Sequence, residues 1–285
     1  MSTTQEERQI MGETPPKAVP PKDLTEHMSF LEHLEELRWH IIKGLIGIVV
    51  GVIVAIVYAD FILAEVILGP AKADFLVYKW IGLEAQDITF QSRRLTGQFF
   101  AYWGSILISG MIIGAPIFFY QMWRFIEPAL EFKEKKSAFL YTLFISFFFF
   151  LGIGFGYFIL TPFALQFFAQ FQPIGEELIR NDFDINQYFG SISMWILACG
   201  FLFQIPVVSY FLSMLGLLTP EFLRKYQKHS VVISLVVAAV FTPPEPVSQL
   251  VMAVPIFFLY ELSIWISKVT LKRREKDLEK AFSDS

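Results

Sequence analysis

Long apolar segments recur along this sequence, and short polar stretches separate them. A helix needs about 20 apolar residues to cross the roughly 30 Å hydrocarbon core of a bilayer. Segments of this kind run over 41–59, 99–123, 138–160, 192–214 and 247–267. Charged residues make up 18% of the chain, whereas soluble domains carry about 25%. The sequence therefore predicts an all-α integral membrane protein.

A further apolar segment, 230–242, is shorter and ends at the run Pro243-Pro244-Glu245-Pro246. At 1.5 Å per residue it reaches only about 20 Å. Two interpretations are open: a half-helix that dips back, or a short span in a locally thinned bilayer. The first would place the basic residues of the final tail on the outer side of the membrane.

Lysine and arginine residues gather in alternate loops. With six crossings, the side of the amino terminus holds 18 of the 23 and the opposite side holds five. Because cytoplasmic loops carry the excess of these residues, we predict six transmembrane helices with both termini in the cytoplasm. Residues 1–27, which are polar and rich in proline, are predicted to be a disordered cytoplasmic tail. Residues 28–268 then form the membrane domain, and 269–285 form a charged cytoplasmic tail.

An acidic stretch precedes the first span. Ser29 and Glu32 have the spacing of a capping box, which predicts a helix start. At 100° per residue, one side of this helix is apolar and the other carries His33, Glu36 and His40 beside Glu32. A solvated face would explain the pattern. The apolar side can also lie on the membrane surface and present carboxylates to the cytosol.

A second acidic stretch lies in the predicted cytoplasmic loop 124–136, where Glu127, Glu131 and Glu134 alternate with four cations. Local ion pairing would account for it. Topology, however, requires only lysine and arginine on this face, and carboxylates near a surface can engage guanidinium groups bidentately. Recognition of an arginine-containing ligand is therefore the functional interpretation of both stretches.

Polar residues inside the apolar segments are few. Gln204 lies mid-segment before Pro206, Glu261 lies in the last segment, and Thr242 and Gln249 flank the proline-rich corner. Such groups hydrogen-bond to partner helices or serve function. Glycine pairs at four-residue spacing predict close helix packing: Gly47 and Gly51, Gly110 and Gly114, Gly152 and Gly156. The single Cys199 is expected to be a small core residue.

Sequence signatures of catalysis are missing. The chain has no HExxH, P-loop or GxSxG motif, and its four histidines show no metal-ligand spacing. We therefore expect neither an enzyme nor a bound metal or cofactor. A secondary transporter of a small solute is the alternative function, but inverted repeats and a midplane polar site would then be expected. A membrane-embedded enzyme would need a cluster of His, Asp or Ser facing one cavity.

Three motifs resemble the TatC family, the signal-peptide receptor of the twin-arginine protein translocase, over residues 29–268. They are His33-Leu-Glu-Glu-Leu-Arg38, then Ala115-Pro-Ile-Phe-Phe-Tyr-Gln-Met-Trp-Arg-Phe-Ile-Glu-Pro-Ala-Leu130 followed by Glu134, and Phe241-Thr-Pro-Pro-Glu-Pro-Val-Ser-Gln249 with Ala253-Val-Pro255 and Leu259-Tyr-Glu261. The resemblance implies a six-helix concave scaffold in the bacterial cytoplasmic (inner) membrane.

The resemblance also implies roles for individual residues. Glu36 and Glu134 would receive the paired arginines of a signal peptide, with Phe125 and Pro128 shaping the loop beside them. Thr242 and Gln249 would dock a single-span TatA-like or TatB-like subunit. Gln204 stands where many members carry a glutamate, so it can hydrogen-bond but not titrate, and it is assigned to partner-helix docking. Several copies would export folded precursors with the proton-motive force, without nucleic acid, nucleotide or cofactor.

Overall fold

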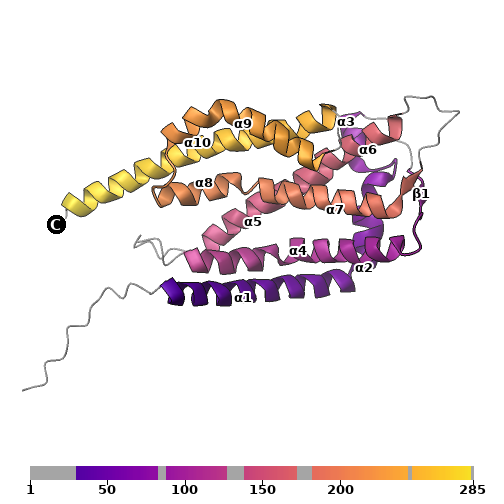
Figure 1. The fold of residues 1–285 in the computed structure, drawn as a ribbon, viewed down its shortest axis with the longest axis horizontal. Helices are drawn as coiled ribbons and strands as arrows, with labels where there is room; N and C mark the ends of the chain where they lie inside the picture. The colour runs from indigo at the N-terminus through magenta and orange to yellow at the C-terminus, as the bar shows by residue number, and fades with distance from the viewer. Residues whose placement is uncertain (1–29, 83–87, 127–137, 172–181, 243–245, 284–285) are drawn as a thin grey trace, which may run out of the picture. The chain divides into compact units, whose positions relative to one another are not determined.

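The computed structural model describes residues 30–82, 88–126, 138–171, 182–242 and 246–283, and these are mostly helical (Figure 1). The chain divides into two compact units after Glu36. In the first unit, residues 30–36 form the opening turns of helix α1 (Phe30–Val57), which agrees with the predicted helix start. The predicted tail 1–27 lies outside the described residues.

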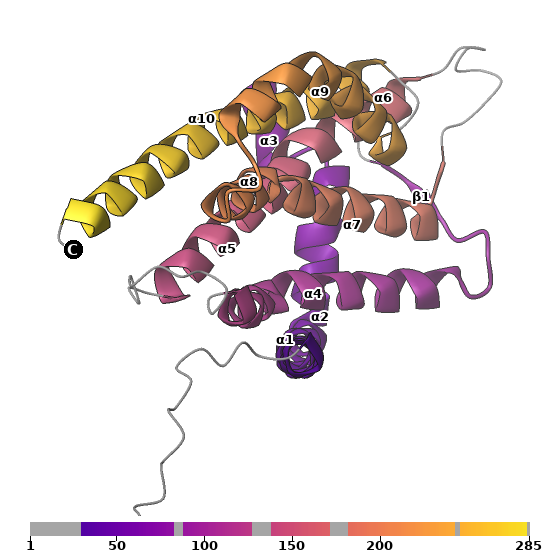
Figure 2. The same ribbon diagram turned by 60° about the vertical axis from the view of Figure 1, so that its left-hand side comes forward.

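The second unit contains all the predicted apolar segments as helices. After α1 come α4 (Gly97–Ile126), α5 (Ala138–Phe155), α7 (Ile185–Leu202), α8 (Ile205–Met214), α9 (Pro220–Phe241) and α10 (Pro246–Ser283). A π-helical turn, η4 (Gly156–Leu160), joins α5 to α6 (Thr161–Gln170). Successive long helices run in alternating directions (Figure 1), and α9 packs beside α10 (Figure 2). Five stretches are long and apolar enough to cross a membrane: Leu34–Val57, Gly97–Ile126, Leu140–Gln170, Ile185–Met214 and Gln249–Lys276.

The segment 230–242 proves to be the apolar end of a longer helix. Helix α9 has 22 residues rather than 13, because it begins at Pro220, where the Thr219 hydroxyl accepts a hydrogen bond from the backbone N–H of Phe222 at 3.2 Å. Its first turns carry Arg224, Lys225 and Lys228, so α9 is not among the five apolar stretches. The carboxyl-terminal tail predicted over 269–285 continues α10 as a helix to Ser283.

The fourth predicted segment, 192–214, lies within the apolar stretch Ile185–Met214, which a short break divides into two helices. Helix α7 ends at Leu202 and α8 begins at Ile205. Pro206 at the start of α8 has no backbone N–H, and its ring clashes with the carbonyl one turn earlier. The Gln204 side chain lies at this break and donates from Nε2 to the Ile145 carbonyl of α5 at 3.3 Å.

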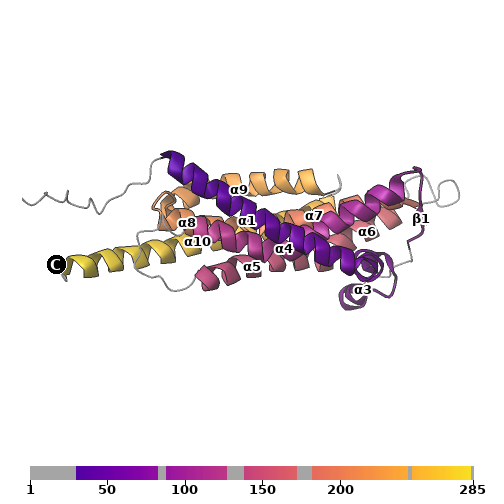
Figure 3. The ribbon, with the colours of Figure 1, turned by 90° about the horizontal axis from the view of Figure 1, so that it is seen from below.

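The glycine pairs mark close helix contacts, as predicted. Gly51 of α1 lies against Gly110 and Gly114 of α4, and a Cβ added to Gly114 would come within 2.6 Å of the Gly47 carbonyl oxygen. Figure 3 shows α1 lying along α4. In the same way, Gly152 and Gly156 contact α7 around Cys199, which is buried. Backbones therefore meet directly at both interfaces.

Short elements close one end of the second unit, and the sequence did not predict them. They are α2 (Ala59–Phe61), the π-helix η1 (Ile62–Ile67), the 3₁₀ turn η2 (Gly69–Ala71), α3 (Leu76–Ile81), and the strands β1 (Phe90–Gln91) and β2 (Phe183–Asp184). The strands pair in parallel, Phe90 opposite Phe183, so the all-α prediction was incomplete.

Three tyrosine hydroxyls hold the chain where it turns at this end. Tyr157 donates to the Val66 carbonyl at 2.7 Å, Tyr188 to Ile67 at 2.8 Å and Tyr78 to Pro70 at 2.6 Å. Carbonyls at the end of a helix lack intrahelical partners, and a buried carbonyl without a partner is costly. The tyrosines supply the missing donors, so Tyr157 and Tyr188 fix η1 against η4 and α7, and Tyr78 fixes η2 against α3.

Candidate functional site

The two predicted arginine-binding carboxylates are not brought together by the described residues. Glu36 lies on α1 in the first unit, whereas Glu134 and Pro128 lie outside the described residues. Phe125 is described near the end of α4, with its ring 6.3 Å from that of His40. His40 follows Glu36 by one helical turn along α1.

Gln121 lies beside His40 and Phe125, and it was not predicted from the sequence. Its Oε1 lies 3.3 Å from His40 Nδ1, so it links α4 to α1 beside Phe125. The signal was present in the sequence. Gln121 precedes Phe125 by four residues and therefore shares its helix face. The described part of the candidate site in the second unit is thus His40, Gln121 and Phe125.

Thr242 and Gln249 both bond to helix α9. The Thr242 hydroxyl donates to the Ala238 carbonyl at 2.8 Å and is buried, and Gln249 Nε2 donates to the Leu235 carbonyl at 3.1 Å. These residues lie at the corner between α9 and α10, as predicted. Gln204 belongs to a different contact, since its bond goes to α5. The structure therefore groups two of the three predicted docking residues.

Glu261 is paired within the bundle. Its Oε1 accepts a hydrogen bond from Gln227 Nε2 of α9 at 2.5 Å, and the neighbouring Tyr260 hydroxyl donates to the Leu223 carbonyl at 2.7 Å. Gln227 was not predicted as a partner, because the sequence alone does not give the register between α9 and α10. These bonds fix that register near the charged end of α9.

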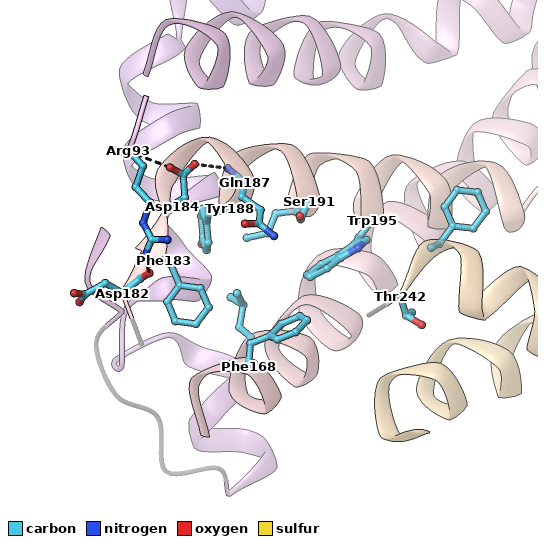
Figure 4. Close-up of a pocket in the computed structure, with 13 residues that line it drawn as sticks. Arg93, Phe168, Asp182, Phe183, Asp184, Gln187, Tyr188, Ser191, Trp195 and Thr242 are labelled. Carbon is cyan, nitrogen blue, oxygen red and sulfur yellow. Dashed lines mark hydrogen bonds between the residues drawn. The ribbon is translucent and has the colours of Figure 1, made fainter. Parts of the chain in front are cut away.

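A cavity of about 480 Å³ opens between α6, α7 and the end of α9 (Figure 4). Its size falls within the roughly 300–1,000 Å³ of small-ligand sites. Phe168, Trp195 and Phe241 contribute apolar walls, and Thr242 lies at that end. Arg93 and the carboxylates of Asp182 and Asp184 lie at the other end (Figure 4). The predicted docking residue Thr242 thus borders a cavity that no sequence pattern indicated.

The carboxylates at the charged end of the cavity hold two loops together. Asp184 accepts hydrogen bonds from the backbone N–H groups of Asn186, Gln187 and Arg93 at 3.0, 3.1 and 3.2 Å. Asp182 accepts from the Thr89 hydroxyl at 2.9 Å and from Gln91 Nε2 at 2.6 Å. Asp184 is therefore the N-cap of α7, and its carboxylate also binds the backbone at Arg93, just after strand β1.

These contacts lower the pKa of the Asp184 carboxyl. The hydrogen bond from the Gln187 backbone lowers this pKa most, and burial opposes it with a smaller effect. The backbone N–H groups of Arg93 and Asn186 and the charge of Arg94 lower the pKa further. A carboxyl with a depressed pKa stabilises the folded state above its unfolded pKa of about 3.9, and this contribution disappears as the pH falls through the folded value.

We therefore expect the thermal unfolding midpoint of the purified protein to fall as the pH is lowered below about 4. Asp184→Asn should keep the cap geometry, because asparagine is also a good N-cap, but should lessen this acid sensitivity. Asp74→Asn, on an exposed residue of the same end of the unit, is the control. The role of Asp184 is contradicted if both variants follow the wild-type pH profile.

Comparison with known proteins identifies the family. The sequence model of the family described as Sec-independent protein translocase protein (TatC) matches residues 32–255 of this chain. The chain belongs to the TatC family. A TatC of Blattabacterium from Periplaneta americana is 34% identical over 267 residues, which cover 89% of this chain and all of the relative. A TatC of Halalkalibacterium halodurans is 38% identical over 255 residues, 89% of this chain and 94% of the relative.

The fold agrees with a solved TatC. The crystal structure of a twin-arginine translocase receptor, TatC, superposes with a TM-score of 0.69 at 31% identity, over 84% of this chain and 99% of that chain. This TatC-family chain is therefore a multi-pass membrane protein and a subunit of the twin-arginine translocase. It is not an enzyme, and the alternatives of a solute transporter and a membrane-embedded enzyme are set aside.

Proposed function

We propose that this subunit is the receptor of its translocase, binding the twin-arginine signal peptides of folded precursors at the cytoplasmic face. Several copies assemble with TatA-like or TatB-like single-span subunits, and the proton-motive force drives export. One observation carries the proposal: the similarity to a protein described as a twin-arginine translocase receptor extends over 99% of that protein.

The proposed topology has six crossings in the bacterial inner membrane, with both termini in the cytoplasm. Helix α9 is the additional crossing beside the five apolar stretches. The excess of lysine and arginine on one side supports this topology. So does the alternating direction of successive helices, which places the start of α9 and the end of α10 at the same end of the unit (Figure 1).

Glu36 and Glu134 are the proposed partners of the two arginines, with Phe125 and Pro128 beside them. Hydrogen bonds to charged groups contribute about 1.5–3 kcal/mol each, so two such contacts give a selective anchor. Within the second unit, Phe125 near the end of α4 packs against His40 of α1, which supports a site that includes the end of α4. Lysine lacks the planar fork of arginine and should substitute poorly in the peptide.

Purification of the tagged full-length chain in a mild detergent tests the proposal. Small single-span proteins and precursors with paired arginines should be recovered with it. Recovery of the chain alone, from membranes that contain those proteins, would argue against a receptor role.

The corner formed by Thr242 and Gln249 is the proposed docking point for the single-span subunit. Gln249→Leu removes the amide that could bond to a polar group of that helix, and it loses one intramolecular bond worth about 0.6–1 kcal/mol. We expect the recovered single-span subunit to fall severalfold while cross-linking of signal peptides continues. Gln170→Leu, whose amide bonds within α6 at 3.0 Å, is the matched control. Equal recovery with both variants would remove Gln249 from the docking point.

A further inference from the structure

One face of helix α10 changes from apolar to basic along its length. Val254, Phe258 and Trp265 are 49%, 65% and 62% exposed, and Lys268, Lys272 and Lys276 follow on the same side, all exposed. The spacings of three, four and seven residues keep these side chains on one helix face. Glu261 lies on the same face between Phe258 and Trp265 and bonds to Gln227 of α9, so the uninterrupted exposed stretch runs from Trp265 into the row of lysines.

Trp265 marks where this face leaves the hydrocarbon, because tryptophan collects at the membrane–water interface. At 1.5 Å per residue, Lys268 lies about 4.5 Å and Lys272 about 10 Å beyond it. The polar layer of one leaflet is roughly 5–8 Å thick, and lysine side chains can bend back toward it. Lys276, about 16 Å beyond Trp265, comes closer when the helix is tilted. Lys268 thus lies at headgroup depth and Lys272 just above it, whereas Lys276 lies farther out and approaches the headgroups through its long side chain.

Contacts on the opposite side of α10 keep this face turned outward. Arg274 lies half a turn away from the lysine row, and its guanidinium packs on the turn at Gly216, where φ is 76°. Ser267 accepts a hydrogen bond from the Ser213 hydroxyl at 2.8 Å and donates to the Leu218 carbonyl. Because α10 is fixed to the α8–α9 connection at this level, the lysines cannot turn into the bundle.

Among the residues whose side chains the structure describes, which on α10 end at Lys276, no ion pair joins any of the three ammonium groups to a carboxylate. Glu275 is exposed between Lys272 and Lys276 and offsets one charge, which leaves a net positive face. Basic clusters immediately outside a transmembrane helix attract anionic lipids. Their continuity with a lipid-facing apolar stripe favours a membrane lipid over a soluble partner.

We propose that Lys268, Lys272 and Lys276, with Trp265 as the interfacial anchor, form a binding face for the headgroups of anionic phospholipids. The acyl chains lie along the stripe of Phe258 and Val254. This binding requires neither a signal peptide nor a partner subunit, so it stands or falls separately from the receptor function.

Native mass spectrometry of the full-length protein in detergent measures this binding directly. Phosphatidylglycerol should bind in preference to phosphatidylcholine, and the triple variant Lys268→Gln, Lys272→Gln, Lys276→Gln should bind phosphatidylglycerol roughly 10- to 100-fold more weakly. The charge-preserving variant with three arginines should bind like the wild type. Unchanged binding by the glutamine variant would overturn the proposal.

A second triple variant tests the location. Arg224→Gln, Lys225→Gln, Lys228→Gln removes the same charge from exposed positions on α9 at the same end of the unit. It should weaken phosphatidylglycerol binding much less, and an equal loss would place the site elsewhere. Inorganic phosphate at matched concentration should not compete. Full competition would indicate a general anion site and contradict recognition of a lipid. A thermal unfolding midpoint equal to that of the wild type verifies that each variant is folded.

Discussion

Replacing Gly114 by leucine is expected to force helices α1 and α4 apart and to remove most of the folded protein from the membrane. A Cβ at this position would come within 2.6 Å of the Gly47 carbonyl oxygen and 2.7 Å of Ile48 Cα. Both are backbone atoms, which cannot rotate away as a side chain can. Overpacking typically costs 1–3 kcal/mol and occasionally more. We expect the upper end here, because the whole helix must move.

The measurement is the fraction of monodisperse protein after extraction in a mild detergent, together with its thermal unfolding midpoint. Gly104→Leu is the matched control, because Gly104 lies on the same helix and a Cβ there meets nothing within 4 Å. Similar losses in the two variants would show that α4 tolerates no leucine at all. The close contact of α1 with α4 would then not be the cause.

The double variant Glu36→Gln, Glu134→Gln is expected to weaken cross-linking of a twin-arginine peptide by about 100-fold or more. Glutamine preserves size and hydrogen-bonding capacity but removes the charge that makes each guanidinium contact worth about 1.5–3 kcal/mol. Each single variant should give an intermediate loss. A peptide with paired lysines should bind the wild type weakly and should be less affected by the double variant.

Glu35→Gln is the control for this experiment, because it removes a neighbouring carboxylate from the same helix. It should leave cross-linking near the wild-type level. Normal cross-linking by the double variant would exclude Glu36 and Glu134 from the binding site, although membership of the TatC family would stand. A loss with Glu35→Gln as large as that with Glu36→Gln would indicate a diffuse acidic surface instead.

The positions of the membrane helices could be predicted because hydrophobicity is a local property of the chain. The segments over 99–123 and 138–160 are helices, and the glycine pairs on α1, α4 and the run from α5 into η4 lie where helices touch. The break before Pro206 was also encoded locally, since proline cannot continue a helix without cost. The extent of α9 was missed because its first ten residues are too polar to resemble a span.

Contacts between distant segments could not be predicted. Phe90 and Phe183 are paired across 93 residues, and nothing near either residue indicates the other. The cavity beside Thr242 is built from α6, α7, the end of α9, strand β2 and Arg93, so it depends on the whole arrangement of helices. The register that joins Gln227 to Glu261 depends on how α9 and α10 pack. The candidate residues could be named from motifs, but their neighbours on other helices could not.

The pairing of β1 with β2 has a consequence for biogenesis. While the chain is being synthesised, β1 leaves the ribosome before α4, α5 and α6, and its partner strand follows only after all three. Until then the segment around Gln91 has no strand to bond to and Asp182 is absent. The pairing of β1 with β2 can therefore form only after α5, η4 and α6 have been inserted and the end of α6 has reached the same side of the membrane as β1.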